Sequence, residues 1–314
     1  MIGRDQRKLL EILRVIAEAK RPVGARTISD ILSSRGYNLG ERAVRYNLRI
    51  LDELGFTRRH GYSGRIATPL GMKELRDALI HERIGFVNTL IEEYMLRTTF
   101  DLSEGDLVAN ISLIDRNDLD RSLEIMDRVA EAGYSGDLVR VSQRDDCVEI
   151  GTVCSITVDG MLLKAGVPIN TTFAGVLEIR SSEPYRFSDL IAYAGTSIDP
   201  MRAFMARRIA RVMDAVRSGS GKVLANVREV PASALEDAMR ILERARSIVG
   251  RIVVGAPGED VLGCPVAPGR VGIAICAGVN APVAVGECGI RIQTSPISTT
   301  MPYSEMSRIR FYKS

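Results

Sequence analysis

The chain has 314 residues, enough for two or three domains, and its 46% hydrophobic and 26% charged content is ordinary for a globular protein. Residues 1–20 are charged throughout, which argues against a signal peptide. The longest uncharged apolar stretch, 271–286, is shorter than the roughly 20 residues of a membrane span. We therefore expect a cytoplasmic protein without a membrane partner.

The net charge of +3 is unevenly distributed along the chain. Residues 1–80 contain 16 Lys or Arg and 9 Asp or Glu, a net of +7, whereas the remainder carries 26 basic and 30 acidic residues, a net of −4. A basic head on a slightly acidic body suggests that the head binds a polyanion.

The five cysteines are widely spaced and form no CxxC pair, which argues against a disulfide framework. The two histidines are His60 and His81, so histidine-based catalytic triads and metal sites are excluded from the body. We expect no catalytic residues, no metal and no cofactor.

Three helices are predicted in the head, within 5–20, 25–37 and 38–56, and each has apolar residues at helical spacings. The third combines an apolar face that includes Val44 and Leu48 with arginines that project to another side. Glycines end the second and third helices.

Two short polar-apolar segments then flank Gly61 to Gly64 and predict a basic β-hairpin, after which another helix begins near Gly71. Three helices followed by a basic hairpin resemble the winged helix-turn-helix of transcription regulators. Such a head would place its third helix in the major groove of DNA.

The candidate DNA-binding residues follow from this arrangement. Arginines of the third helix suit guanine edges, those of the hairpin suit phosphates, and hydroxyls near the start of the second helix could reach phosphates, although Thr27 is equally plausible as an N-cap. The set is Thr27, Ser29, Arg42, Arg45, Tyr46, Arg49, Arg58, Arg59 and Arg65. The alternative is that these arginines form a solvated face of a winged helix that binds protein.

The body contains an internal duplication. The segment LVANISLI, 107–114, matches VLANVREV, 223–230, at an offset of 116 residues, and the same offset continues through the following helix. Each half predicts helix, strand, helix and three further strands, an α/β unit with a mixed sheet. The halves span about 84–200 and 201–314, and a cleft between them would be a common place for a ligand.

A shorter repeated motif occurs further along each half. VPINTTF, 167–173, and SPISTTM, 295–301, share Pro-Ile-x-Thr-Thr, now at an offset of 128. We expect the two motifs to occupy equivalent points of the duplicated domain.

The chain as a whole resembles the NrpR-type nitrogen-responsive transcriptional repressors. The points of resemblance are the head, the junction HERIGFVNTLIEEYMLRTTFDLSEGDLVANISLI, the Cys-bearing GTVCS and FAGVLEI. The resemblance implies an α+β or α/β protein with a winged-helix DNA-binding domain at 1–80 and a duplicated effector-binding and dimerisation domain at 81–314. It also implies a homodimer on a palindromic operator of nitrogen-assimilation genes, released by 2-oxoglutarate.

A small dicarboxylate needs hydroxyl, backbone N–H and cationic donors in a largely apolar pocket. Chemistry and repeat symmetry single out Thr152, Cys154, Ser155, Thr171, Thr172, Arg180, Cys276, Thr299 and Thr300 as candidate effector-binding residues. Cys154 and Cys276 are expected at similar positions of the two halves. Threonines also suit strands and buried cysteines act as small hydrophobes, so a purely structural role remains open for each.

Two other classes of function are compatible with the sequence. The body could be an enzyme acting on a small acid through Cys154 or Cys276, fused to a winged helix used for autoregulation. It could also be a redox or metal sensor that uses its cysteines.

Overall fold

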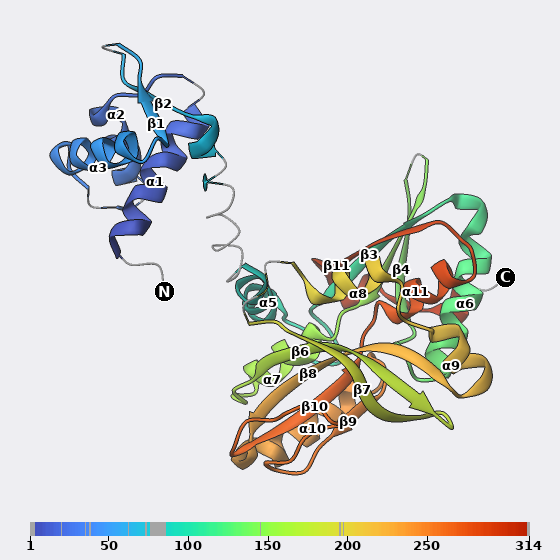
Figure 1. Ribbon diagram of the computed structural model, residues 1–314. Helices are drawn as coiled ribbons and strands as arrows, with labels where there is room; N and C mark the ends of the chain where they lie inside the picture. The colour runs from blue at the N-terminus through green and yellow to red at the C-terminus, as the bar shows by residue number, and fades with distance from the viewer. Residues whose placement is uncertain are drawn as a thin grey trace. The chain divides into compact units, whose positions relative to one another are not determined.

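The computed structural model describes residues 4–19, 21–34, 36–37, 39–61, 63–72, 74–75, 86–144, 146–194, 196 and 198–312. The chain divides into two compact units, Met1–Ile84 and Gly85–Ser314, called the head and the body below (Figure 1).

The head is a three-helix unit with a two-stranded wing. Its elements are α1 (Arg4–Ala19), α2 (Ala25–Ser34), α3 (Glu41–Glu53), β1 (Thr57–Arg59) and β2 (Arg65–Ala67). Ile12 and Ile16 of α1, Ile28 of α2 and Leu48 of α3 are buried in one apolar cluster. The helical spacing of apolar residues in the sequence therefore identifies the faces that meet in this core.

The wing is attached to the helices by a third backbone segment, which contains Val23 and lies between α1 and α2. Thr57 pairs with Ala67 across the antiparallel hairpin, and Arg65 also exchanges both backbone hydrogen bonds with Val23, at 3.0 Å each. Gly64 has φ +122°, and a Cβ there would lie 2.3 Å from the Val23 carbonyl, so only glycine fits this close approach.

The body contains two five-stranded sheets. In chain order its larger elements are α5 (Phe86–Arg97), β3 (Asp106–Ile114), α6 (Leu119–Glu131), β4 (Leu138–Gln143), β5 (Val148–Val153), α7 (Ile156–Lys164), β6 (Asn170–Arg180), β7 (Glu183–Ala192), α8 (Pro200–Arg207), α9 (Val212–Ser218), β8 (Gly221–Pro231), α10 (Leu235–Ala245), β9 (Ile252–Val254), β10 (Arg270–Cys276), α11 (Asn280–Glu287), β11 (Ile292–Pro302) and β12 (Ser307–Arg308). None of the helices in the described residues is both long and apolar enough to cross a membrane.

The two halves of the body exchange their last strands. Each half has the order β-α-β-β-α-β of a ferredoxin-like unit: β3-α6-β4-β5-α7-β6 in the first half and β8-α10-β9-β10-α11-β11 in the second. The sheets, however, are ordered β11-β3-β5-β4-β12 and β7-β6-β8-β10-β9, so β6 completes the sheet of the second half and β11 that of the first (Figure 1). Neighbouring strands of these sheets pair antiparallel, which differs from the mixed pairing expected from the sequence.

Equivalent hydrogen bonds support the duplication. The Val108 amide donates to Thr157 Oγ1 at 2.9 Å, and the amide of Leu224, 116 positions later, donates to Asn280 Oδ1 at 2.8 Å. Thr157 and Asn280 lie in the first turns of α7 and α11, the helices that precede the two exchanged strands.

The strand register corrects the expectation about the two Pro-Ile-x-Thr-Thr motifs. Thr299 on β11 lies opposite Ala109, whose counterpart in the second half is Ala225. Ala225 lies opposite Gly175 on β6, four positions beyond Thr171. The motifs therefore occupy different points of their strands, and the expected equivalence was wrong. Thr171 lies opposite Arg228, and Thr294 lies opposite the equivalent Ser112. The counterpart of Thr171 is thus Thr294, and the displacement exists before either bulge.

The two connections from α6 to β4 and from α10 to β9 make a reciprocal contact. A Cβ on Gly136 would lie 2.1 Å from the Ile248 carbonyl oxygen, and one on Gly250 would lie 3.0 Å from the Ser135 amide nitrogen. Each connection thus presents a glycine to the backbone of the other, as at an interface between related subunits.

We expect Gly136→Ala to lower the free energy of unfolding of the body by about 1–3 kcal/mol, because the added methyl group meets backbone that has no room to shift. The matched control is Gly286→Ala at an exposed position of α11, where the nearest atom lies at 3.5 Å and helix propensity favours alanine by up to about 1 kcal/mol. Urea unfolding followed by circular dichroism measures both. Equal midpoints for the two variants would contradict the close contact.

Candidate functional site

The outer face of α3 is basic and exposed. Val44, Leu48 and Leu51 of this helix are buried in the head, whereas Arg42, Arg45, Tyr46 and Arg49 are exposed. Tyr46 has an exposed fraction of 65%, and Arg45 forms an ion pair with Glu41 one turn away at 2.6 Å. An ion pair this exposed contributes little, about 0–1 kcal/mol, so the guanidinium is available to a stronger anion.

Of the three wing arginines that were predicted to contact phosphate, two are exposed to solvent. Arg58 and Arg59 are exposed on β1. Arg65 instead turns inward, where its Nε lies 2.8 Å from Asp52 Oδ2 while Thr57 donates to Asp52 Oδ1. The prediction that Arg65 contacts phosphate is therefore unsupported, because its side chain is engaged in joining the wing to the end of α3.

The two hydroxyl side chains near the start of α2 that were predicted to reach phosphates also differ in their exposure. Thr27 is exposed, but Ser29 is buried and donates to the carbonyl oxygen of Leu39 at 2.7 Å. Ser29 thus fastens α2 to the segment that precedes α3, and its hydroxyl is unavailable to a phosphate.

In the body, the largest fully buried side chain is that of Arg228 on β8. Its Nε lies 2.6 Å from Asp159 Oδ1 on α7, and both side chains have an exposed fraction of 0%. Ser155 Oγ accepts from Arg228 Nη2 at 3.1 Å, and Thr171 donates to Asp159 Oδ2 at 3.1 Å. Burial raises the pKa of Asp159, and the neighbouring guanidinium opposes that shift.

More polar groups lie close to this pair. Asn226 Nδ2 donates to the Tyr193 hydroxyl at 2.7 Å, and burial raises the pKa of that phenol well above its usual value. Burial likewise raises the pKa of the Cys154 thiol to about 12 and that of the Asp199 carboxyl above its usual range. Asp199 caps α8 by accepting from the Met201 amide at 3.0 Å.

Three predicted effector residues, Cys154, Ser155 and Thr171, therefore gather around a buried charge pair that our sequence analysis missed. The signal was present, since Arg228 lies in the middle of a predicted strand and aligns with the smaller Ser112 in the first half. Pro282 is the counterpart of Asp159, at the spacing that relates Thr157 to Asn280. The pair thus distinguishes one half from the other.

The remaining predicted residues are scattered. Thr152 is buried on β5 and accepts from Asn110, while Thr172 donates to the Val227 carbonyl oxygen. Arg180 is exposed near the far end of β6, pairs with Glu178 and stacks 3.7 Å from the Tyr185 ring centre, so it does not join the buried cluster.

Cys276 ends β10 and lies against Gly250. Its strand counterpart is Val153, because these two residues lie opposite the equivalent Ala225 and Ala109. The expected correspondence of Cys276 with Cys154 is therefore displaced by one residue.

Thr299 and Thr300 lie on a cavity of about 440 Å³ over the sheet that contains β11, β3, β5 and β4. Its lining residues are Ile111, Arg140, Arg144, Glu149, Ser295, Ser298, Thr299, Thr300 and Met301. Arg140 pairs with Glu305 at 2.9 Å, and Arg144 pairs with Glu149. The cavity thus combines two guanidinium groups with several hydroxyls.

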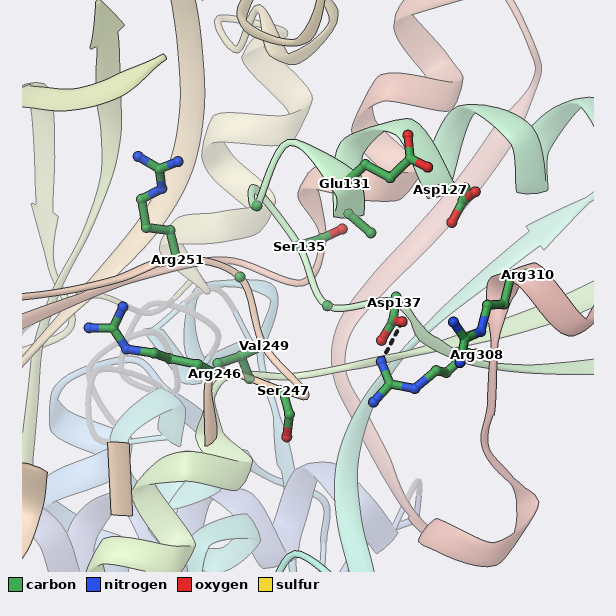
Figure 2. Close-up of a pocket in the computed structure, with 14 residues that line it drawn as sticks. Asp127, Glu131, Ser135, Asp137, Arg246, Ser247, Val249, Arg251, Arg308 and Arg310 are labelled. Atoms are coloured by element: carbon green, nitrogen blue, oxygen red, sulfur yellow. Dashed lines mark hydrogen bonds and ion pairs between the residues drawn. The ribbon is translucent and has the colours of Figure 1, made fainter. Parts of the chain in front are cut away.

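A second cavity, of about 520 Å³, lies beside the reciprocal contact of the two helix-to-strand connections (Figure 2). Arg246, Arg251, Arg308 and Arg310 line it together with Asp127, Glu131 and Asp137. Figure 2 shows the guanidinium groups of Arg246 and Arg251 directed to one side and that of Arg308 directed toward Asp137, with which it pairs at 2.6 Å. These cations do not converge on one point, and none of the predicted effector residues lines this cavity.

The three buried cysteines show little sign of reactivity. Burial raises the pKa of Cys264 and of Cys276 to about 12, as it does for Cys154, so the nucleophilic thiolate is disfavoured at neutral pH. Within the described part of the chain no three His, Cys, Asp or Glu side chains are grouped as metal ligands. These observations do not favour the enzyme or the thiol-sensor alternative.

Comparisons with known proteins agree with both units. Residues 84–308 match the family described as NrpR regulatory domains NRD1 and 2, and residues 10–75 match the Ribonuclease R winged-helix domain. The chain is 47% identical to the Global nitrogen regulator NrpRI of Methanosarcina mazei, over 97% of this chain and 98% of that protein.

One further relative and one solved structure are similar. The Global nitrogen regulator NrpR of Methanocaldococcus jannaschii is 34% identical over 97% of this chain, which spans 55% of that protein's length. The crystal structure of a nitrogen repressor-like protein from Methanococcus jannaschii matches with a TM-score of 0.63 and 26% identity, covering 71% of this chain and 98% of that one.

The fold and these matches define a protein in which a winged-helix head precedes a duplicated regulatory body, the fold class expected from the sequence. Within that class, the chain belongs to the NrpR family.

If Arg58 and Arg59 contact phosphates, replacing either with alanine should reduce the slope of log K for DNA against log salt by about 0.9, because one fewer counterion is released. Arg65→Ala should leave the slope unchanged and lower the melting temperature of the head, because it unpairs Asp52. Fluorescence anisotropy with duplex DNA at several salt concentrations, together with thermal melts, separates the two effects. A reduced slope for Arg65→Ala would contradict its structural assignment.

Arg228→Met should destabilise the body by about 3–5 kcal/mol, because Asp159 is left buried without its partner. Adding Asp159→Leu should restore most of this loss, since an apolar pair needs no counter-charge. In Arg228→Met the raised pKa of Asp159 favours the protonated form on folding, so the stability lost relative to the parent should be smallest below about pH 4 and should grow as the pH rises. Urea unfolding of the parent and of both variants over a pH series measures these changes in stability. A loss of stability in Arg228→Met that does not depend on pH would contradict the role of Asp159.

Proposed function

We propose that this protein is a DNA-binding repressor of nitrogen-assimilation genes whose hold on its operator is relieved by 2-oxoglutarate. The observation that carries this proposal is an exposed row of basic side chains on α3 and the wing, in a chain whose body matches NrpR regulatory domains. The similar proteins are named global nitrogen regulators and a nitrogen repressor-like protein, in accord with that role.

The head supplies the DNA contacts. α3 enters the major groove, where Arg42, Arg45 and Arg49 reach guanine edges and Tyr46 makes apolar contact with bases. Arg58 and Arg59 hold adjacent phosphates, and Thr27 adds a hydroxyl at the start of α2. A homodimer brings two such heads to the halves of a palindromic operator about 34 Å apart, a spacing set by one turn of DNA.

The body supplies the response to nitrogen supply. A ligand changes DNA affinity only if it prefers one arrangement of the protein over another. Allosteric couplings are typically about 1–3 kcal/mol, which alters operator affinity by roughly 5- to 150-fold. No cofactor is needed for this action, which involves no chemical reaction.

The decisive measurement is the affinity of the full chain for DNA from upstream of its own gene, with and without 2-oxoglutarate. We expect specific binding that weakens about 10-fold or more at millimolar 2-oxoglutarate. Glutamate, which carries an amino group in place of the keto oxygen, serves as the chemical control. Specific DNA binding that is unaffected by 2-oxoglutarate would contradict the sensing part of the proposal. Absence of specific binding to any operator would contradict the whole proposal.

The double variant Arg42→Ala/Arg49→Ala should lose at least 10-fold in specific affinity, since each bidentate base contact contributes about 1–3 kcal/mol. Arg246→Ala, an exposed arginine of the body, is the control for a general loss of positive charge. Equal losses for the double variant and the control would indicate that α3 does not read the operator.

A further inference from the structure

The segment from α8 to the start of β8 concentrates positive charge in the body. Residues 202–222 contain six Arg or Lys and a single acidic residue. The duplicated positions 116 residues earlier, 86–106, contain one arginine and five acidic residues, and Glu92 stands where the second half has Arg208. Because the two segments are copies within one duplicated domain, the shared fold does not require positive charge at these positions.

Four arginines of this segment form an exposed group, called the basic corner below. They are Arg207 and Arg208 at the end of α8, Arg211 directly before α9, and Arg217 within α9, and each side chain is exposed. Within the described residues, none of the four makes an ion pair with a carboxylate.

Two carboxylates lie beside the basic corner. Glu287 accepts from the amides of the first two residues of α9, at 2.9 and 2.8 Å, and Asp214 lies in the first turn of the same helix. Four guanidinium groups therefore accompany two carboxylates, one of which is already engaged with the backbone. The corner consequently keeps an excess of positive charge.

The backbone of the basic corner is held in a fixed conformation. Arg208 has φ +50° at the end of α8, a left-handed position where glycine is usual. Arg211 Nη1 donates to the carbonyl oxygens of Arg208 and Ala210 at 2.9 and 2.7 Å. The backbone of Arg211 also exchanges hydrogen bonds with Lys222 on β8, at 2.8 and 3.2 Å. A rigid turn of this kind loses little conformational entropy when its side chains bind a partner.

The basic corner lacks the apolar component of a protein interface. No large hydrophobic side chain is exposed in the segment 199–222, all of which the structure describes. A stable protein–protein interface has a well-packed apolar centre, whereas contact with the DNA backbone depends chiefly on exposed cations. Arginine suits this task because its guanidinium group can donate two hydrogen bonds to one phosphate. The observations therefore favour duplex DNA over an acidic protein as the partner.

We propose that the basic corner binds phosphates of the DNA that flanks the operator, as a second DNA contact in addition to that of the head. The proposal rests on the proposed function, in which the head binds an operator. The corner adds affinity without adding sequence specificity, because phosphates carry no direct information about the bases.

The test compares two DNA lengths, with the full chain and without 2-oxoglutarate. One duplex is trimmed to the footprint of the head, and the other extends it by two helical turns, about 20 base pairs, on each side. Fluorescence anisotropy at several salt concentrations gives the slope of log K against log salt for each duplex. The test variant is Arg207→Gln/Arg208→Gln/Arg217→Gln, which leaves Arg211 in place as a structural residue.

The triple variant should lower the salt slope on the extended duplex by about 2–3 per protomer, because each lost phosphate contact removes roughly 0.9. On the trimmed duplex it should match the parent. The matched control, Arg128→Gln/Arg244→Gln/Arg246→Gln, removes three other exposed arginines of the body and should match the parent on both duplexes. Equal slopes for the parent and the triple variant on the extended duplex would overturn the proposal.

Two further measurements separate DNA contact from other roles. Lysine at the same three positions keeps the charge and should retain the parent slope, and a loss as large as that with glutamine would indicate a structural role and overturn the proposal. If the glutamine triple variant melts early, Arg217→Gln alone should lower the slope by about 0.9. Analytical ultracentrifugation compares the assembly state of the parent and the triple variant. Conversion of a dimer into monomers would assign the corner to contact with a second copy of the chain, against the proposal.

The failure of this proposal and that of the proposed function are distinguishable. If the parent binds its operator specifically but the corner variants keep the parent slope on the extended duplex, only the flanking contact is wrong. If the parent binds no operator, the proposed function is wrong, and this proposal is wrong with it.

Discussion

The exchange of the last strand between the two halves is the constraint on which the rest of the body depends. β6 forms hydrogen bonds along β8, and β11 forms them along β3, so each sheet contains a strand from the other half. Neither half can complete its sheet alone, and an unpaired strand edge would expose a row of backbone donors and acceptors. The halves are consequently one folding unit, although the sequence reads as two copies.

This interlocking explains how two similar halves can differ in what they do. Because the exchange holds both sheets together, each copy can lose a feature without losing its fold. The second half keeps a long connection that covers its sheet with Val261 and Val266, whereas the first half leaves the corresponding face open. The first half also supplies Asp159, and the second supplies its partner Arg228.

The buried Arg228–Asp159 pair joins the halves at considerable cost. Two charges removed from water need a close partner and further hydrogen bonds, which Ser155 and Thr171 provide. Since an apolar pair of the same volume would often be as stable, we interpret the ion pair as a device for specificity. It allows α7 to dock on β8 in a single register.

Much of the architecture is legible in the amino-acid sequence because it depends on local spacing. The apolar positions of α3 determine that Arg42 and Arg49 face outward, and the 116-residue offset identifies β3 and β8 as copies. The cavity of about 440 Å³ on the first sheet was only partly predictable: Thr299 and Thr300 line it, but Arg140 and Arg144 did not stand out from other surface arginines.

Only the tertiary structure decided which residues distant in the chain contact one another. Arg65 pairs with Asp52 and Ser29 with Leu39, so two predicted DNA contacts are instead part of the head's own framework. The two Pro-Ile-x-Thr-Thr motifs look equivalent in the sequence, but they pair with different points of the equivalent strands β8 and β3. Sequence alone determined which faces are apolar, basic or repeated, because those follow from periodicity. It could not determine which strand pairs with which, because strand exchange depends on hydrogen bonds between residues more than 40 positions apart.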